Sequence, residues 1–219
     1  QPMAFVRRDE AFVPVALQSL YIERNLYVGP DGRWIAGHVP EVYRIYPFAL
    51  GRGEGDQLLV FVDEESDLLS ETDGELLFGA DGGYAPVLRG DVDLLRRVAA
   101  QAKVTEDACA ALARHGLIVP WELRVQSGDS SETAPVHGLY RIDEAALNAL
   151  PDAGFLELRR ASALPVAWCQ MLSMKHISFL QALALQHSRA AQDGAGAAAA
   201  SDATLDFLSS DTVVDLGRL

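Results

Sequence analysis

Short apolar runs separated by turn residues fill the first half of the chain and predict β-strands. Ala4–Arg7 and Phe12–Leu17 flank a charged tripeptide, an arrangement typical of a hairpin. Leu26–Val28 precede the turn sequence Gly-Pro-Asp-Gly, in which Gly32 can take a positive φ at little cost. Leu58–Val62 are continuously apolar, which predicts a strand buried on both faces.

Helical spacing dominates the second half. Asp91–Lys103 carry apolar residues at helical intervals, and Thr105 is predicted to cap a new helix that ends at Gly116. Val119–Val125 alternate as a strand, and Val136–Ile142 are the predicted hairpin partner of that strand. The pattern therefore changes from period two to period 3.6 along the chain, with one later hairpin.

Three further helices are predicted near the C-terminal end. Asp143 can cap a short helix that ends before Pro151, and a second helix covers about Leu164–Leu172. Ser173 is the predicted cap of a third helix, which runs from Met174 to about Ser188. We expect two apolar sets to face the core, namely Trp168, Met171 and Leu172 on one helix and Ile177, Leu180 and Ala184 on the next.

These patterns together predict an α+β fold, with a mainly antiparallel sheet in the first half and helices from the second half packed on it. Residues 1–188 are predicted to form a single domain. The low-complexity stretch 189–203 reads as a linker, although its alanines could extend the preceding helix. Residues 204–219 alternate acidic and apolar side chains and form a predicted tail segment. We identify no internal repeat.

A formal net charge of −13 narrows the classes of partner. Nucleic-acid and anionic-membrane surfaces are disfavoured, because binding to them depends on lysine and arginine. No apolar run is long enough to span a bilayer, and no secretory signal is present, so we expect no membrane insertion and a cytoplasmic location. Cys109 and Cys169 lie in apolar helical patterns and are predicted to be buried free thiols.

No catalytic motif stands out in the sequence. The chain lacks a Gly-x-Ser-x-Gly elbow and a His-Glu-x-x-His pair, so we predict no catalytic residue, no bound metal and no cofactor. The one metal-ligand set that can be assembled is His38, Glu41 and Asp63, which would suit a three-ligand iron or zinc site. An iron-dependent oxygenase-like enzyme, or a subunit of one, is therefore the alternative hypothesis.

The segment from Gly32 to Phe48 gathers aromatic and basic residues more densely than any other part of the chain. If Val42–Phe48 is extended, Arg44 shares one face with aromatic neighbours. Pro47 cannot donate to a strand ladder, which places this predicted strand at a sheet edge. An arginine flanked by aromatics on an edge suits recognition of a peptide or a carboxylate.

We therefore predict a ligand-binding site in this region. An alternative stays open in which Arg44 makes a structural ion pair with Asp63 or Glu64 and the aromatics fill the core. The predicted ligand-binding residues are Trp34, Arg44, Tyr46, Phe48 and Asp63.

The order of several short motifs resembles the SapC family of bacterial proteins. The motifs that carry the resemblance are NLYV (25–28), GRW (32–34), VPEVYRIYPF (39–48), VDEES (62–66), GELLF (74–78), TEDACAALARHGL (105–117), GLYRIDEAALNAL (138–150) and MLSM (171–174). QPMAFV at the start resembles a stretch that in the family follows several tens of residues, so we expect the family's N-terminal segment to be absent. His38 and Ile45 depart from the usual tyrosine and second arginine.

The resemblance implies a role near protein export. The resemblance associates the family with secretion of surface-layer proteins. It also implies that family members occur as neighbours of JmjC/cupin-like oxygenases and halogenase-like proteins. We predict a non-catalytic accessory protein that binds a peptide or protein and assists its modification or export. Two alternatives remain, the oxygenase-like enzyme and a structural module of a larger polypeptide, and self-association into a homo-oligomer is also left open.

Overall fold

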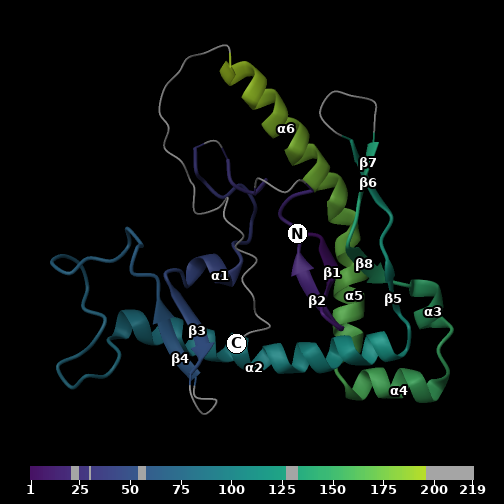
Figure 1. Ribbon diagram of the computed structural model, residues 1–219, viewed down its shortest axis with the longest axis horizontal. Helices are drawn as coiled ribbons and strands as arrows, with labels where there is room; N and C mark the ends of the chain where they lie inside the picture. The colour runs from purple at the N-terminus through teal and green to yellow at the C-terminus, as the bar shows by residue number, and fades with distance from the viewer. Residues whose placement is uncertain (21–24, 30, 54–57, 127–132, 196–219) are drawn as a thin grey trace. The chain divides into compact units, whose positions relative to one another are not determined.

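The computed structural model describes residues 1–20, 25–29, 31–53, 58–126 and 133–195 (Figure 1). The described chain divides into two compact units. Unit 1 contains Gln1–Ala36 and the residues from Val104 onward, and unit 2 contains Gly37–Lys103. The predicted tail, 204–219, and the later part of the predicted linker lie outside the described residues.

Four antiparallel strands form the sheet of unit 1, in the order β2-β1-β8-β5 (Figure 1). Their bounds are Met3–Arg8 (β1), Ala11–Ala16 (β2), Ile118–Pro120 (β5) and Leu139–Ile142 (β8). The predicted N-terminal hairpin is confirmed, with Phe5 of β1 opposite Pro14 of β2. On its other side Phe5 lies opposite Tyr140 of β8. Phe5 is completely buried, because its side chain lies in the hydrophobic core of unit 1.

The second predicted hairpin is present but divided into two ladders. Its outer part pairs β6 (Leu123–Gln126) with β7 (Thr133–Val136), and its inner part pairs β5 with β8. The ladders separate at Gly138, which has a φ of +82°. On the other strand, Trp121 donates its backbone N–H to the carbonyl oxygen of Leu139. The carbonyl oxygen of Trp121 accepts the N–H of Leu123, and this bond forms a tight turn between β5 and β6.

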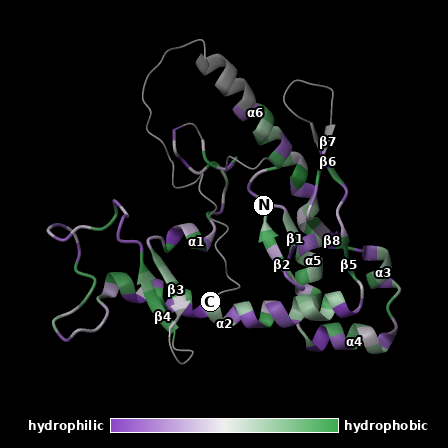
Figure 2. Cartoon of the chain, in the orientation of Figure 1, coloured by the Kyte–Doolittle hydropathy of each residue, from purple (hydrophilic) through white to green (hydrophobic). Residues whose placement is uncertain are grey.

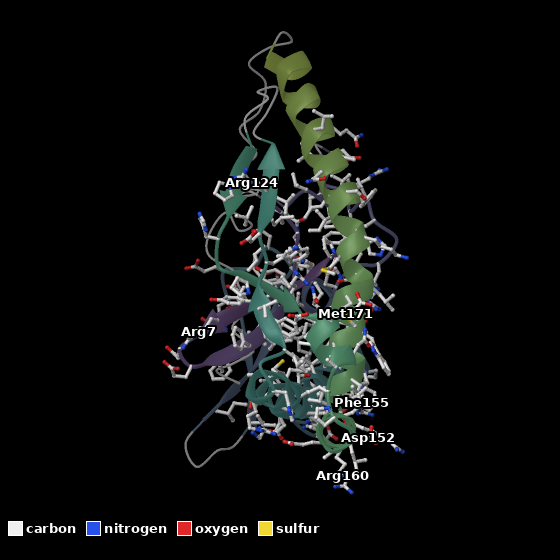
Figure 3. The ribbon with its side chains drawn as sticks, turned by 90° about the vertical axis from the view of Figure 1, so that its right-hand side faces the viewer. Arg7, Arg124, Asp152, Phe155, Arg160 and Met171 are labelled. Atoms are coloured by element: carbon white, nitrogen blue, oxygen red, sulfur yellow. The ribbon has the colours of Figure 1, made fainter. Side chains whose placement is uncertain are left out.

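Helices form the C-terminal part of unit 1. They are α3 (Glu144–Asn148), α4 (Asp152–Arg160), α5 (Ala163–Ser173), the 3-10 turn η2 (Met174–His176) and α6 (Ile177–Ala195). Asp143 caps α3 as predicted, since its carboxylate accepts the backbone N–H of Ala146 over 3.0 Å. Helix α4 was not predicted; Asp152 and Arg160 mark its two ends in Figure 3. No helix in the described ranges is long and apolar enough to cross a membrane.

One long helix, α2 (Pro86–Arg114), replaces the two helices predicted around Thr105. The predicted N-cap at Thr105 is wrong because no Gly or Pro interrupts the chain from Val92 to Arg114, so the helix continues through it. The predicted end at Gly116 is confirmed by its φ of +65°.

The main core of unit 1 lies between the sheet, the last turns of α2 and the inner face of α5. Its buried residues include Phe5, Cys109, Leu112, Leu117, Ile142, Leu158, Leu164 and Ala167. The prediction of a buried thiol is confirmed for Cys109 and is wrong for Cys169, which is exposed on α5. The two-layer arrangement of sheet and helices confirms the α+β prediction.

The apolar positions predicted to face the core are correct on α6 and partly wrong on α5. Ile177 and Leu180 are buried in a second cluster of unit 1. In contrast, Trp168 is exposed and Leu172 is 70% exposed. Helix α5 contains no charged residue, so apolar spacing alone could not decide which of its faces meets the sheet.

Ser173 has a role other than the predicted cap. Its hydroxyl donates to the carbonyl oxygen of Gln170 over 2.7 Å and accepts the backbone N–H of Met3 over 2.8 Å. It therefore fastens the end of α5 to β1. Helix α6 continues to Ala195, into the stretch predicted as a linker.

Unit 2 is smaller and is organised around a two-stranded antiparallel ribbon of β3 (Phe48–Arg52) and β4 (Leu58–Val62). It also contains α1 (Glu41–Arg44) and the N-terminal part of α2. Ile45, Leu50 and Leu95 form its buried cluster, and Phe48 and Val60 pack against them. One face of the ribbon is thereby held against α2.

Candidate protein-interaction surface

The segment from Val42 to Tyr46 is not the predicted edge strand. Glu41–Arg44 form one helical turn, which closes when Ile45 donates its backbone N–H to Glu41 over 3.1 Å. Ile45 is buried, and this turn brings it inward. A cis peptide bond joins Tyr46 to Pro47, and the extended strand begins only at Phe48. The predicted sharing of one strand face by these side chains is therefore wrong.

Arg44 extends from the last turn of α1 and is exposed. Its Nη1 lies 3.3 Å from Oε1 of Glu41, one helical turn earlier. Within the described part of the chain, this guanidinium reaches the carboxylate of Glu41, whereas the alternative hypothesis paired it with Asp63 or Glu64. An exposed pair at this spacing contributes little to stability.

Tyr46 and Asp63, two of the predicted site residues, do meet. The Tyr46 hydroxyl donates to Oδ2 of Asp63 over 2.9 Å. The backbone N–H of Asp63 donates to the carbonyl oxygen of Pro47 over 3.0 Å, and its Oδ1 accepts the N–H of Glu65 over 3.1 Å. These bonds fix a tyrosine and a carboxylate beside the end of the β3–β4 ribbon, where both side chains reach solvent.

The other two predicted site residues take part in packing. Phe48 packs against the buried cluster of unit 2. Trp34 lies in unit 1, where its indole stacks on the ring of Tyr27 with the ring centroids 5.4 Å apart. Burial raises the pKa of Tyr27. The structure thus brings Tyr46 and Asp63 together, and ligand binding by the five residues stays a prediction.

The most conspicuous feature of unit 2 is the exposure of β4, coloured as hydrophobic in Figure 2. Leu58, Leu59, Phe61 and Val62 are each between 39% and 50% exposed. The prediction that this strand is buried on both faces is wrong in the isolated chain. The reason is the size of the ribbon: among the described residues β4 has one neighbouring strand, and of its side chains Val60 packs against the buried cluster that includes Leu95 of α2.

Phe61 forms a flat aromatic surface on the solvent side of the ribbon. It lies opposite Ala49, and its ring covers Gly51 on the neighbouring strand. A Cβ atom at Gly51 would lie 2.5 Å from Cε2 of Phe61, so the ring position depends on this glycine. Phe61 and Leu59 therefore share an uncharged face that is open to solvent.

The edges of the ribbon are also available for pairing. In the sheet formed by the described residues, β3 and β4 each have one neighbouring strand. The outer edge of each strand consequently offers backbone N–H and C=O groups. An uncharged strand with an open edge is a favourable place for a further strand to add.

The metal ligands of the alternative oxygenase hypothesis do not form a cluster. Among the residues the structure describes, no group of three or more His, Cys, Asp or Glu side chains is close enough to hold a metal ion. Glu41 contacts Arg44 and Asp63 contacts Tyr46, so each carboxylate of that alternative set has another partner. His38 is exposed.

Sequence comparison identifies the family of the chain. No curated protein and no solved structure matches it. The family model described as SapC matches residues 1–180, which include Gly37–Lys103 of unit 2 and unit 1 as far as the first turn of α6. The match starts at Gln1 and does not support the expectation of an absent N-terminal segment. Because the match extends over more than half of the chain, the protein belongs to the SapC family.

Proposed function

We propose that this chain is a non-catalytic accessory protein that binds a peptide or protein partner along the β3–β4 ribbon. One observation carries the proposal. The five residues of β4 have the composition of a strand buried on both faces, yet four of them are exposed. A strand of this kind is covered when a partner adds to it.

The chemistry of the ribbon favours an extended, largely apolar segment of the partner. The open strand edge supplies backbone hydrogen bonds, and Leu59 and Phe61 supply apolar area on one face. Tyr46 and Asp63 lie beside the end of the ribbon and offer polar contacts there. Affinity would come from the backbone bonds, and selectivity from alternate side chains.

Family membership supports the wider role. The association of the family with surface-layer protein secretion implies a part in modification or export of a surface or secreted protein. A JmjC/cupin-like oxygenase or a halogenase-like protein is the proposed enzyme partner, and the cytoplasm is the proposed place of action. This chain would then hold the substrate segment or position the enzyme.

The proposal is tested with a library of extended peptides displayed on phage. Peptides selected on the intact protein are measured by calorimetry against the native chain and against a Leu59→Ser/Phe61→Ser variant. We expect the variant to bind about tenfold more weakly or worse, because the central apolar contacts of an interface dominate its affinity. Bound peptide should also slow hydrogen exchange of the β4 amides.

Leu172→Ser provides the matched control, since Leu172 is an exposed apolar residue of α5 in unit 1. This variant should bind the selected peptides as the native chain does. Circular dichroism confirms that all variants fold. If no peptide is enriched, or if enriched peptides bind the ribbon variant equally well, the proposed function is wrong.

A further inference from the structure

Two β-hairpins of the chain share one backbone design, although no repeat was identified from the sequence. The first is Leu26–Ile35 in unit 1, and the second is Leu76–Ala85 in unit 2. Both follow the pattern Gly-x-Asp-Gly-x-aromatic, beginning at Gly29 and Gly79 respectively. Pro30 of the first hairpin lies outside the described residues.

The backbone hydrogen bonds that close the two turns correspond. In each, the first glycine donates its N–H across the turn over 2.8 Å, and the second glycine donates to the first over 2.9 Å. An isolated bridge joins Val28 to Trp34 in one hairpin and Phe78 to Tyr84 in the other. The outer bonds also match, from Ile35 N–H to Tyr27 at 2.8 Å and from Ala85 N–H to Leu77 at 2.9 Å.

The aspartate of the pattern supports each turn in the same way. Oδ1 of Asp31 accepts the N–H of Arg33 over 3.2 Å, and Oδ1 of Asp81 accepts that of Gly83 over 3.0 Å. These are Asx-type bonds, which favour a tight turn. The hairpins are therefore equivalent structural elements, one in each unit.

Helix α6 covers the hairpin of unit 1. Leu26 is 3% exposed and lies in a buried cluster with the apolar face of α6, which consists of Ile177, Leu180 and Leu183. Nε2 of His187, on the same helix, lies 3.1 Å from the carbonyl oxygen of Leu26. In unit 1, the apolar face of a helix therefore covers this type of hairpin.

The equivalent surface of unit 2 is open. Leu76 occupies the position of Leu26 and is 80% exposed. Phe78, at the position of Val28, is 55% exposed. The chain therefore contains the same hairpin twice, once covered by a helix and once with Leu76 and Phe78 exposed.

Acidic side chains gather around the second hairpin. Glu71, Asp73, Glu75 and Asp81 are exposed along the segment that leads into and through it. Arg89 is the nearby cation, and its Nη2 donates to the carbonyl oxygen of Tyr84. A helix that approaches this surface gains from positive charge on its flanks.

From these observations we infer that the second hairpin binds an amphipathic helix of a partner protein, with an aliphatic stripe flanked by lysine or arginine. The inference deepens the proposed function and rests on it, but it uses a surface distinct from β4. A second copy of this chain is a poorer occupant. The apolar face of α6 is already buried in its own unit, and a net charge of −13 opposes self-association.

The probe is a peptide with the sequence Met174–His187 of this chain, which contains the face that covers the first hairpin. Gln181 and Gln186 lie on the exposed side of α6 and become lysine in one peptide and glutamate in the other. We expect the lysine peptide to bind about tenfold more tightly than the glutamate peptide at low salt, and the difference to shrink as salt is added.

A Leu76→Ser/Phe78→Ser variant locates the binding site. Both side chains are exposed, so the variant should fold, and it should bind the lysine peptide about tenfold more weakly or worse. Binding that survives in this variant would report exchange of α6 on the first hairpin and would overturn the inference. Failure of the lysine peptide to bind the native chain, or equal binding of both peptides, would also overturn it.

The Leu59→Ser/Phe61→Ser ribbon variant separates this inference from the proposed function. It should bind the lysine peptide as the native chain does. If ribbon peptides bind and helical peptides do not, the inference fails while the proposed function stands. If helical peptides bind and no ribbon peptide is enriched, the ribbon as the partner site is wrong.

Discussion

The side-chain amide of Gln170 accepts the backbone N–H of Ile142 at 2.9 Å, at a position fully excluded from solvent. The same amide donates from Nε2 to the carbonyl oxygen of Met3 over 3.2 Å. One glutamine on α5 therefore satisfies backbone groups of β8 and β1, two adjacent strands of the sheet. The helix is fixed in place on the sheet by these polar bonds as well as by apolar contact.

Replacing Gln170 with leucine should destabilise unit 1. The change removes the amide that pairs with the N–H of Ile142 and the carbonyl oxygen of Met3, and each backbone group left unsatisfied in the core costs about 1–3 kcal/mol. Urea unfolding monitored by circular dichroism measures the loss. Gln181→Leu, the same change at an exposed position of α6, should leave the midpoint nearly unchanged. Equal midpoints for the native chain and Gln170→Leu would show that these bonds contribute nothing.

Gln170 also illustrates where sequence patterns are sufficient and where they are not. The N-terminal hairpin was predictable because alternation and a charged turn agree. The orientation of α5 was not, because a buried glutamine replaces an expected apolar residue while Leu172 faces solvent. The choice depends on the backbone groups of Ile142 and Met3, which only the assembled sheet brings near.

The candidate site was predictable only in part, because local patterns do not determine which residues the fold brings together. Tyr46 and Asp63 were both in the predicted set, and the structure brings them together. The strand predicted to contain Tyr46, however, begins as a helical turn. Aromatic and β-branched residues favour a strand locally, but burial of Ile45 requires the turn. The exposure of β4 could not be read from its composition, because an apolar run does not reveal how many strands cover it.

The two cysteines should differ sharply in reactivity. Cys109 is buried in the core of unit 1, and burial raises the pKa of its thiol to about 11. Cys169 is exposed on α5. Because the thiolate is the reactive form, iodoacetamide at mildly alkaline pH should modify Cys169 alone in the folded protein. Peptide mass spectrometry measures the labelling.

Denaturation should release the second thiol. In urea both cysteines should react, and a Cys169→Ser variant should remain unlabelled until it unfolds. Rapid native labelling of Cys109 would contradict the buried position that the structure gives it.

Glu157 joins α4 to the end of α2. Nη2 of Arg114 lies 3.0 Å from its Oε1, and Nε2 of His115 lies 3.2 Å from its Oε2. The hydrogen bond from Arg114, followed by that from His115, lowers the pKa of Glu157 below its ordinary value of 4.5. The folded state thus favours the ionised carboxylate.

Glu157→Gln should therefore be less stable than the native chain at neutral pH, and the difference should shrink in acid. A lowered pKa contributes stability above 4.5, and this contribution is lost as the pH falls through the pKa of the folded state. Urea midpoints at neutral pH and near pH 3 measure the trend. Glu122→Gln, at an exposed position, is the control. A difference that grows in acid would contradict the assigned direction.

The equivalence of the two hairpins predicts equal effects of the same substitution in each. Gly32 and Gly82 have φ values of +74° and +76°, and a Cβ at either position would meet no atom within 4 Å. Alanine should therefore cost only the conformational penalty of a left-handed residue, about 1–2 kcal/mol, at both sites. Gly37→Ala, where φ is not positive and space is also open, should be neutral or slightly stabilising. Urea unfolding of the three variants decides the matter: a clear loss for Gly32→Ala without one for Gly82→Ala would show that the second hairpin lacks the turn geometry of the first.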